Sequence, residues 1–258
     1  MRDRIDALLD PKIPFLELST LAASKAYNGE VPGAAQVVGI GIVAGREVMV
    51  HADDASVKGG AWYPLSVEKI VRALDVAIEN RLSVIHLCDG AGGFLPFQAE
   101  FFADPYFAGR ILRNQSILSK MEVPRVAIAM GHYTAGAAYV PALSEFNIMV
   151  ENTGAIFLGG PPVVKAATGE DVSAQELGGA HTHTSVSGTS DYSASSEMHA
   201  IAIARDIVAR FHRPAKTPID QAAPEPPCLR RIGTIRHYSN GPSSAVRHAG
   251  DHRPHDRW

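Results

Sequence analysis

Two hydrophobic patterns alternate along the chain. Short apolar runs without a helical period predict buried strands at residues 15–18, 36–43, 47–51, 83–88, 126–130, 147–150 and 155–158. Apolar residues at helical spacing predict helices at residues 4–9, 67–80, around 111–118, 162–168, 173–177 and 195–211. Strands that alternate with helices indicate an α/β fold with a largely parallel sheet.

Turn residues and helix caps divide these elements. Residues 36–43 and 47–51 form a predicted hairpin, since only three residues separate them. Gly39 and Gly41 superficially resemble a nucleotide fingerprint, but no helix opens after them, so a strand bend or close packing is the better interpretation. Ser66 is predicted to cap the helix at 67–80, and residues 180–192 are predicted to be irregular.

Two predicted strands end in turns of very small residues. The strand at 83–88 runs into DGAGGF, residues 89–94, and the strand at 126–130 is predicted to end at Gly131. Thr134 is then predicted to cap a helix that begins among residues 135–138. Because both strands belong to successive strand–turn–helix units, their turns should open at the same edge of the sheet.

The turn at residues 134–138 is the strongest candidate for chemistry. Its residues are small enough for a ligand carbonyl to approach the backbone, and free N–H groups at a helix start can bind an anion. Such amides can stabilise negative charge on a carbonyl oxygen. The alternative interpretation is that glycine and alanine only pack a helix tightly against the sheet.

Other polar residues give weaker signals. Lys58 beside Gly59 and Gly60 offers a cation and an accessible backbone to a phosphate group, although a solvated loop lysine has the same pattern. His132 could act as a general base or make a local hydrogen bond. His181 and His183 lack the cysteine or acidic companions of a metal site, so no metal is predicted.

Composition narrows the function classes. The net charge is −3 and no basic stripe is interleaved with aromatic residues, so nucleic acid is not a predicted partner. No apolar run reaches the length of a membrane span, and the charged start does not resemble a signal peptide. The two cysteines, Cys88 in a strand and Cys228 near the end, favour a reducing cytoplasm over a disulfide framework.

The composition changes after residue 211. Residues 212–258 are rich in proline, arginine, histidine and glycine without periodicity, which predicts a disordered tail. The expected organisation is a single domain at residues 1–211 followed by that tail.

Five motifs in order make the chain similar to a known family. RIDALLDP, DDASVKGG, MGHYTAGAAYVPA, IFLGGPPVVKAATGE and ELGGA resemble the N-terminal half of the carboxyltransferase (β) subunits of biotin-dependent acyl-CoA carboxylases, most nearly those of the methylcrotonyl-CoA carboxylase type. The resemblance covers about residues 3–211. It implies a crotonase-like (ClpP/crotonase) superhelix of ββα units, and carboxyl transfer from carboxybiotin to an acyl-CoA in leucine breakdown.

The resemblance also implies site residues and partners. It assigns an enolate-binding role to the amides of Gly136 and Ala137 and makes the biotin ureido group the base. Residues matching the coenzyme A side are Lys58, Gly59, Gly60, Gly92, Gly93 and Lys165, and Phe94 and His132 match the acyl side. Implied partners are a biotin-carrying α subunit, a complementary C-terminal carboxyltransferase domain and further copies of the chain in a homo-oligomer.

Departures from the family pattern leave alternatives open. The chain has DGAGGF where the family has a sequence closer to DSGGAN, and His132 and Tyr133 replace a serine and a cysteine, so a crowded acyl cavity is expected. The chain also stops before a second carboxyltransferase domain. One alternative is a truncated, inactive fragment that retains at most coenzyme A binding. Another is a free-standing hydratase or isomerase, for which Glu100 is the candidate carboxylate.

Overall fold

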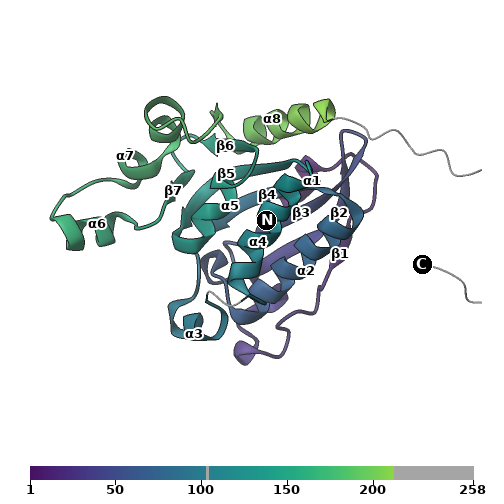
Figure 1. Cartoon of the computed structure of the whole chain (residues 1–258), viewed down its shortest axis with the longest axis horizontal. Helices are drawn as coiled ribbons and strands as arrows, with labels where there is room; N and C mark the ends of the chain where they lie inside the picture. Colours follow the sequence, from purple (N-terminus) through teal and green to yellow (C-terminus); the bar gives the residue numbers. More distant parts are fainter. Residues whose placement is uncertain (103–104, 212–258) are drawn as a thin grey trace, which may run out of the picture. The chain divides into compact units, whose positions relative to one another are not determined.

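A single mixed sheet organises the part of the chain that the computed structural model describes, residues 1–102 and 105–211. Its strands in the described residues are β1 (Leu16–Leu18), β2 (Gln36–Val43), β3 (Arg46–Asp53), β4 (Ser83–Gly90), β5 (Arg125–Thr134), β6 (Phe146–Val150), β7 (Ala155–Phe157) and β8 (Tyr192–Ala194). The spatial order is β1-β2-β3-β4-β5-β6-β8, and β7 pairs with the end of β5 (Figure 1).

The sheet is antiparallel at one end and parallel elsewhere. β1, β2 and β3 pair antiparallel, and the pairs from β3 through β4, β5 and β6 to β8 are all parallel. The predicted hairpin is therefore confirmed as β2 and β3. Close packing explains Gly39, where an added Cβ would lie 2.5 Å from the Leu16 carbonyl oxygen.

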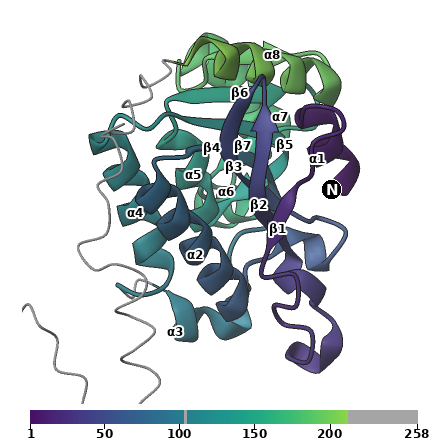
Figure 2. The ribbon, with the colours of Figure 1, turned by 90° about the vertical axis from the view of Figure 1, so that its right-hand side faces the viewer.

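Helices cover both faces of the sheet. They are α1 (Arg2–Leu8), α2 (Pro64–Asn80), α3 (Gln98–Phe101), α4 (Ala108–Lys120), α5 (Tyr139–Ala142), α6 (Pro161–Thr168), α7 (Ala174–Gly178) and α8 (Glu197–Arg210). One apolar core lies between the sheet and α2 with α4, and a second lies between the sheet and α1 with α8. Figure 2 shows α2 and α4 to the left of the sheet, α1 to its right and α8 across the top.

Short helical turns connect the larger elements. Turns of 3₁₀ type occur at Tyr27–Gly29, Pro32–Ala35, Lys58–Gly60, Leu95–Phe97 and Ala135–Ala138, and a π-helical turn occurs at Thr182–Val186. No helix in residues 1–102 and 105–211 has the length and apolarity to cross a membrane. The predicted tail at 212–258 lies outside the described residues.

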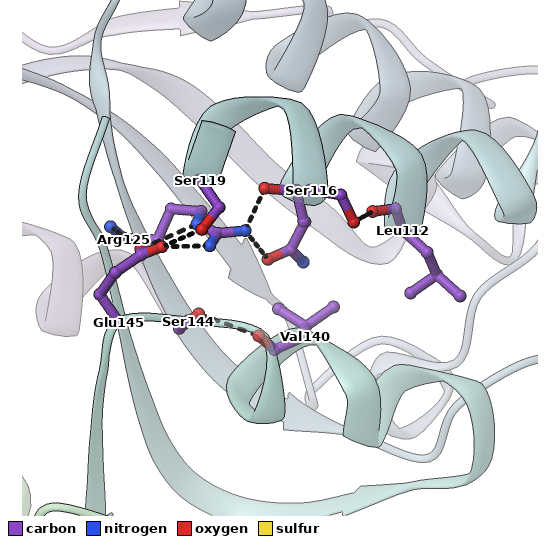
Figure 3. Close-up of polar contacts among 8 residues, drawn as sticks. Leu112, Ser116, Ser119, Arg125, Val140, Ser144 and Glu145 are labelled. Atoms are coloured by element: carbon purple, nitrogen blue, oxygen red, sulfur yellow. Dashed lines mark hydrogen bonds and ion pairs between the residues drawn. The ribbon is translucent and has the colours of Figure 1, made fainter. Parts of the chain in front are cut away.

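A buried ion pair fixes the start of β5. Arg125 is 1% exposed, and its guanidinium pairs with Glu145, which precedes β6, and donates to the main-chain oxygen of Gln115 in α4 (Figure 3). Glu145 also accepts from the main-chain nitrogen of Arg125 at 2.8 Å and from Ser119 at 3.0 Å. This cluster ties α4 and β6 to β5.

Three local predictions were wrong. β5 does not end at Gly131 but continues to Thr134, because residues 132–134 find a partner in β7. Helix α2 begins at Pro64, and Ser66 lies inside its first turn, where its hydroxyl accepts from the main-chain nitrogen of Tyr63 at 3.0 Å. Residues 180–192 are irregular only in part, since they contain the π-helical turn and the start of β8, with residues 187–191 between them.

Candidate functional site

Three loops meet where β3, β4 and β5 end. We call them the site loops: residues 58–62 after β3, residues 91–94 after β4 and residues 135–138 after β5. The first two are joined by main-chain hydrogen bonds from Ala91 to Gly59 (3.0 Å), from Trp62 to Gly92 (2.8 Å) and from Phe94 to Trp62 (2.8 Å). Parallel strands place their carboxyl ends at one edge, so this edge gathers residues from three separate stretches of sequence.

Glycines allow this close approach. An added Cβ at Gly60 would lie 2.5 Å from the carbonyl oxygen of Asp89, and one at Gly92 would lie 2.6 Å from that of Thr134. Gly92 also has a φ of +79°, which side chains rarely adopt. Thr134 does not cap the following turn; its hydroxyl donates to the Ala91 carbonyl at 2.6 Å and so links the second loop to the third.

The third loop presents backbone to solvent. Residues Ala135–Ala138 form a 3₁₀ turn, whose i→i+3 hydrogen bonds leave the first amides without a partner inside the turn. Gly136 is exposed and nothing lies within 4 Å of the position of an added Cβ, whereas the Ala137 side chain is fully buried. A small group can therefore approach the chain at Gly136 without meeting a side chain.

Phe94 is held by an aromatic cluster. Its ring stacks on Tyr63 with the ring centroids 4.5 Å apart, and Tyr27 and Phe97 pack against Tyr63 at 4.8 and 5.9 Å. Gly93 precedes it and forms an isolated bridge with Trp62. The second loop is thus fixed on one side by main-chain hydrogen bonds and on the other by ring packing.

The predicted polar residues lie outside this backbone junction or at its rim. Lys58 begins the first loop, and its hydrogen bond to Glu30 raises the pKa of the lysine. His132 is exposed on β5, with its ring edge-on to Phe157 at 5.8 Å. Lys165 is on α6, which stands apart from the sheet in Figure 1, and its amine donates to Asp171 at 2.7 Å.

Two further side chains near the site loops are those of Tyr133 and Asp89. The side chain of Tyr133 is fully buried, with its ring edge-on to that of Trp62 at a centroid distance of 6.4 Å. Asp89 pairs with Arg4 at 2.7 Å, and its Oδ1 would lie 2.0 Å from a Cβ added at Gly131. Burial lowers the pKa of Arg4, but its hydrogen bonds to Glu197 and Asp89 raise it by more. Asp89 is therefore a structural ion-pair partner.

Sequence reasoning alone does not identify Asp53 and Trp62 as site residues. Both belong to the stretch that contains Lys58, and the Trp62 indole nitrogen donates to Asp53 Oδ1 at 2.7 Å. The sequence signal for this pair is an acidic residue at the end of a buried strand, nine positions before a tryptophan in a glycine-rich loop. Within the described ranges, no three histidine, cysteine, aspartate or glutamate side chains are grouped to hold a metal ion.

Exposed peptide groups at the strand ends of an α/β sheet are of the kind that can stabilise negative charge on a ligand. The comparison with family models agrees: the chain belongs to the carboxyl transferase domain family, whose model matches residues 1–242. The match extends past residue 211 into a segment outside the described residues.

Similar proteins are β subunits of acyl-CoA carboxylases. The mitochondrial methylcrotonoyl-CoA carboxylase beta chain of Arabidopsis thaliana is 49% identical over 215 residues, which are 83% of this chain and 37% of the relative. The biotin-dependent 3-methylcrotonyl-coenzyme A carboxylase beta1 subunit of Mycobacterium tuberculosis is 50% identical over 210 residues, or 81% of this chain and 40% of the relative. The chain thus spans about two fifths of the length of these relatives.

Solved structures confirm the fold. The β subunit of geranyl-CoA carboxylase from P. aeruginosa aligns with a TM-score of 0.74 at 38% identity, covering 81% of this chain and 38% of that one. The transcarboxylase 12S, solved as a hexamer with methylmalonyl-coenzyme A bound, aligns with a TM-score of 0.74 at 30% identity, covering 82% and 41%. The predicted crotonase-like α/β fold is confirmed by this likeness.

Proposed function

We propose that this chain forms the thioester-binding half of the carboxyltransferase of a biotin-dependent acyl-CoA carboxylase, with 3-methylcrotonyl-CoA as the substrate. The observation that carries the proposal is the open backbone at Gly136, at the edge where the three site loops meet. The similarity to methylcrotonoyl-CoA carboxylase β chains supports this substrate. The proposal places the reaction in leucine breakdown and the protein in the cytoplasm.

The proposed chemistry is stabilisation of an enolate. Removing a proton from an acyl thioester puts negative charge on its oxygen, and preorganised peptide N–H groups can stabilise that charge strongly. Gly136 and Ala137 are assigned this role. Carboxybiotin would supply the carboxyl group, and the exposed side of Gly136 is compatible with a second reactant that approaches from solvent.

The remaining predicted residues are assigned to the two ends of the substrate. Gly59, Gly60, Gly92 and Gly93 would let the coenzyme A portion lie close to the main chain, with Lys58 and Lys165 as candidate phosphate contacts. The acyl end is assigned to Phe94, whose ring is fixed by Tyr63, and to His132.

Catalysis is proposed to need partners. A second carboxyltransferase domain would complete the cleft, an α subunit would carry biotin, and a homo-oligomer would hold the halves together. The hexameric assembly of the transcarboxylase 12S supports the last point. Alone, the chain is expected to bind coenzyme A thioesters without turning them over.

Calorimetric titration tests this proposal. The full chain should bind 3-methylcrotonyl-CoA more tightly than acetyl-CoA, and acetyl-CoA more tightly than free coenzyme A, because the thioester carbonyl adds the contact at Gly136. Absence of binding by all three ligands would contradict the assignment. So would hydration of crotonyl-CoA by the isolated chain, which would point instead to a carboxylate such as Glu100, exposed on α3.

A further inference from the structure

A connected set of polar side chains is buried in the sheet beside the site loops. Gln36, His51, Asp53 and His86 are each at most 2% exposed, and Trp62 is 4% exposed. They come from β2, β3, β4 and the first site loop. Buried polar groups must be hydrogen-bonded to avoid a large desolvation cost, so their partners determine how each side chain is held.

The hydrogen bonds of this polar cluster have a defined direction. A carboxylate only accepts, so the Gln36 amide nitrogen donates to Asp53 Oδ1 at 3.0 Å and leaves Gln36 Oε1 as an acceptor. His51 Nε2, 2.9 Å from Gln36 Oε1, must therefore carry a proton. Burial lowers the pKa of His51, so the ring is neutral and its Nδ1 accepts from His86 Nδ1 at 2.9 Å.

The hydrogen bonds of the cluster converge on Oδ1 of Asp53. Asp53 Oδ1 accepts from Gln36 and from the Trp62 indole nitrogen, the latter at 2.7 Å. His86 orients His51, and His51 orients the Gln36 amide. That amide in turn fixes the orientation of the Asp53 carboxylate. The carboxylate in turn fixes the plane of the indole.

Trp62 connects the polar cluster to the second site loop. Its main-chain nitrogen donates to Gly92 and its carbonyl accepts from Phe94, so one residue holds residues 92–94 from both sides. Asp53 also packs directly beneath the end of β4, since an added Cβ at Gly90 would lie 3.4 Å from its Cβ and Cγ. The buried carboxylate thus supports the loop both through Trp62 and by contact.

We propose that Asp53 is a positioning residue of the site, which holds residues 92–94 in place through Trp62. The proposal rests on the proposed function for the role of that loop at the acyl group. Without the acceptor, the indole N–H would be buried and unsatisfied, and Trp62 would have to move to reach water. The main-chain pairs to Gly92 and Phe94 would then loosen.

Four variants of the full chain separate positioning from general stability. Asp53→Leu removes the acceptor while keeping the branched shape of the side chain, Asp53→Asn keeps Oδ1, and Trp62→Phe removes the indole donor while retaining an aromatic ring. The matched control is Asp75→Leu, because Asp75 on α2 accepts from Arg110 and Asn114 on α4 and, within residues 1–102 and 105–211, makes no hydrogen bond to the site loops.

Hydrogen exchange of a peptide covering residues 91–97 is the main readout. Asp53→Leu and Trp62→Phe should speed exchange in this peptide at least about tenfold, while Asp53→Asn and Asp75→Leu leave it at the wild-type rate. If Asp53→Leu does not fold, Trp62→Phe decides alone. Wild-type exchange in Trp62→Phe, or loosening in Asp53→Asn equal to that in Asp53→Leu, would overturn the proposal.

Titration with 3-methylcrotonyl-CoA keeps the two proposals apart. Asp53→Leu and Trp62→Phe should weaken binding at least about tenfold, with Asp53→Asn restoring it. If the wild type binds no thioester, the proposed function fails while the exchange data still decide whether Asp53 holds the loop. If the wild type binds and Trp62→Phe binds equally well, the positioning role fails while the proposed function stands.

Discussion

Gly136 can accept a side chain without disturbing the fold. The space around it is open, and its φ lies outside the left-handed region, so an alanine there meets no neighbour. Most other glycines near the site differ in this respect. At Gly60 and Gly92, for example, an added Cβ would collide with main-chain oxygens of neighbouring segments.

Gly136→Ala is therefore expected to weaken binding of 3-methylcrotonyl-CoA at least about tenfold without lowering the free energy of unfolding, because the methyl group occupies the approach to the amide. Calorimetry and urea unfolding measure the two quantities. Gly154→Ala is the opposite control: its Cβ would lie 2.4 Å from the Ala129 carbonyl oxygen, so it should cost about 1–3 kcal/mol of stability. Unchanged thioester binding by Gly136→Ala would contradict the assignment.

Features that depend on local sequence, such as the exposed turn at Gly136, could be predicted, whereas contacts with a remote partner could not. Gly136 follows a strand and lies in a run of small residues, a local pattern. Asp53 and Arg4 acquire their roles from Trp62, Asp89 and Glu197, and no spacing in the sequence brings these groups together. Likewise, the local sequence around Lys58 and Lys165 does not identify their carboxylate partners, Glu30 and Asp171.

At the scale of elements, the junction of α4, β5 and β6 depends on one buried cation. Arg125 is almost fully buried, whereas the Glu145 side chain is 31% exposed. Burial raises the pKa of Glu145, but its hydrogen bonds with Arg125 lower it by more, so the pair is ionised at neutral pH. The stabilisation from Glu145 is present above the ordinary pKa of the carboxyl group and is lost in acid.

Glu145→Gln should lower the free energy of unfolding at neutral pH by about 2 kcal/mol. Removing one partner of a buried pair leaves an uncompensated charge, and the partial exposure of Glu145 reduces the cost below the ~3–5 kcal/mol of a fully buried pair. Urea unfolding measures the change. Asp171→Asn breaks the exposed pair with Lys165 and should have no measurable effect. A loss no greater in Glu145→Gln than in this control would refute the argument.

The order and type of the main elements could be predicted because their hydrophobic periods are strong. The end of β5 could not, since the strand is extended by β7, a short segment whose pairing is not encoded near Gly131. The turn at Thr182–Val186 was missed for a similar reason. It is held by contacts such as the hydrogen bond between His183 and the Ile156 carbonyl, 27 positions away.

At the scale of the whole molecule, two histidines buried in the sheet make stability depend on pH. The pKa of His86 lies well below its ordinary value, first because of burial and then because of neighbouring His51 and Arg125. Burial also lowers the pKa of His51. The unfolded chain binds protons at these histidines at about pH 6.5, while the folded chain does not, so acid favours unfolding.

His86→Asn should reduce this pH dependence. Asparagine can donate to His51 as the Nδ1–H of His86 does, but it does not titrate. Below about pH 6.5, each such histidine contributes up to about 1.4 kcal/mol per pH unit to the pH dependence of the free energy of unfolding. The slope should therefore be smaller in the variant by the contribution of one histidine. Free energies of unfolding between about pH 7 and pH 5 measure the slope. Equal slopes in variant and wild type would show that His86 does not titrate as described.

The fold class was accessible from the hydrophobic pattern of the sequence, and the family was accessible only through the resemblance of its motifs. The family model and the solved structures confirm the family and the fold. The chain covers about two fifths of the length of these relatives.

Helix α1 and the turn that follows it lie beside helix α8, since Arg4 pairs with Glu197 and Asp10 pairs with Arg205. Together they cover one apolar face of the sheet. During synthesis, this face of the sheet therefore stays uncovered by α8 until nearly two hundred residues have left the ribosome. A nascent chain halted before Glu197 would expose Ile128, Ile148 and Val150 to chaperones and aggregation.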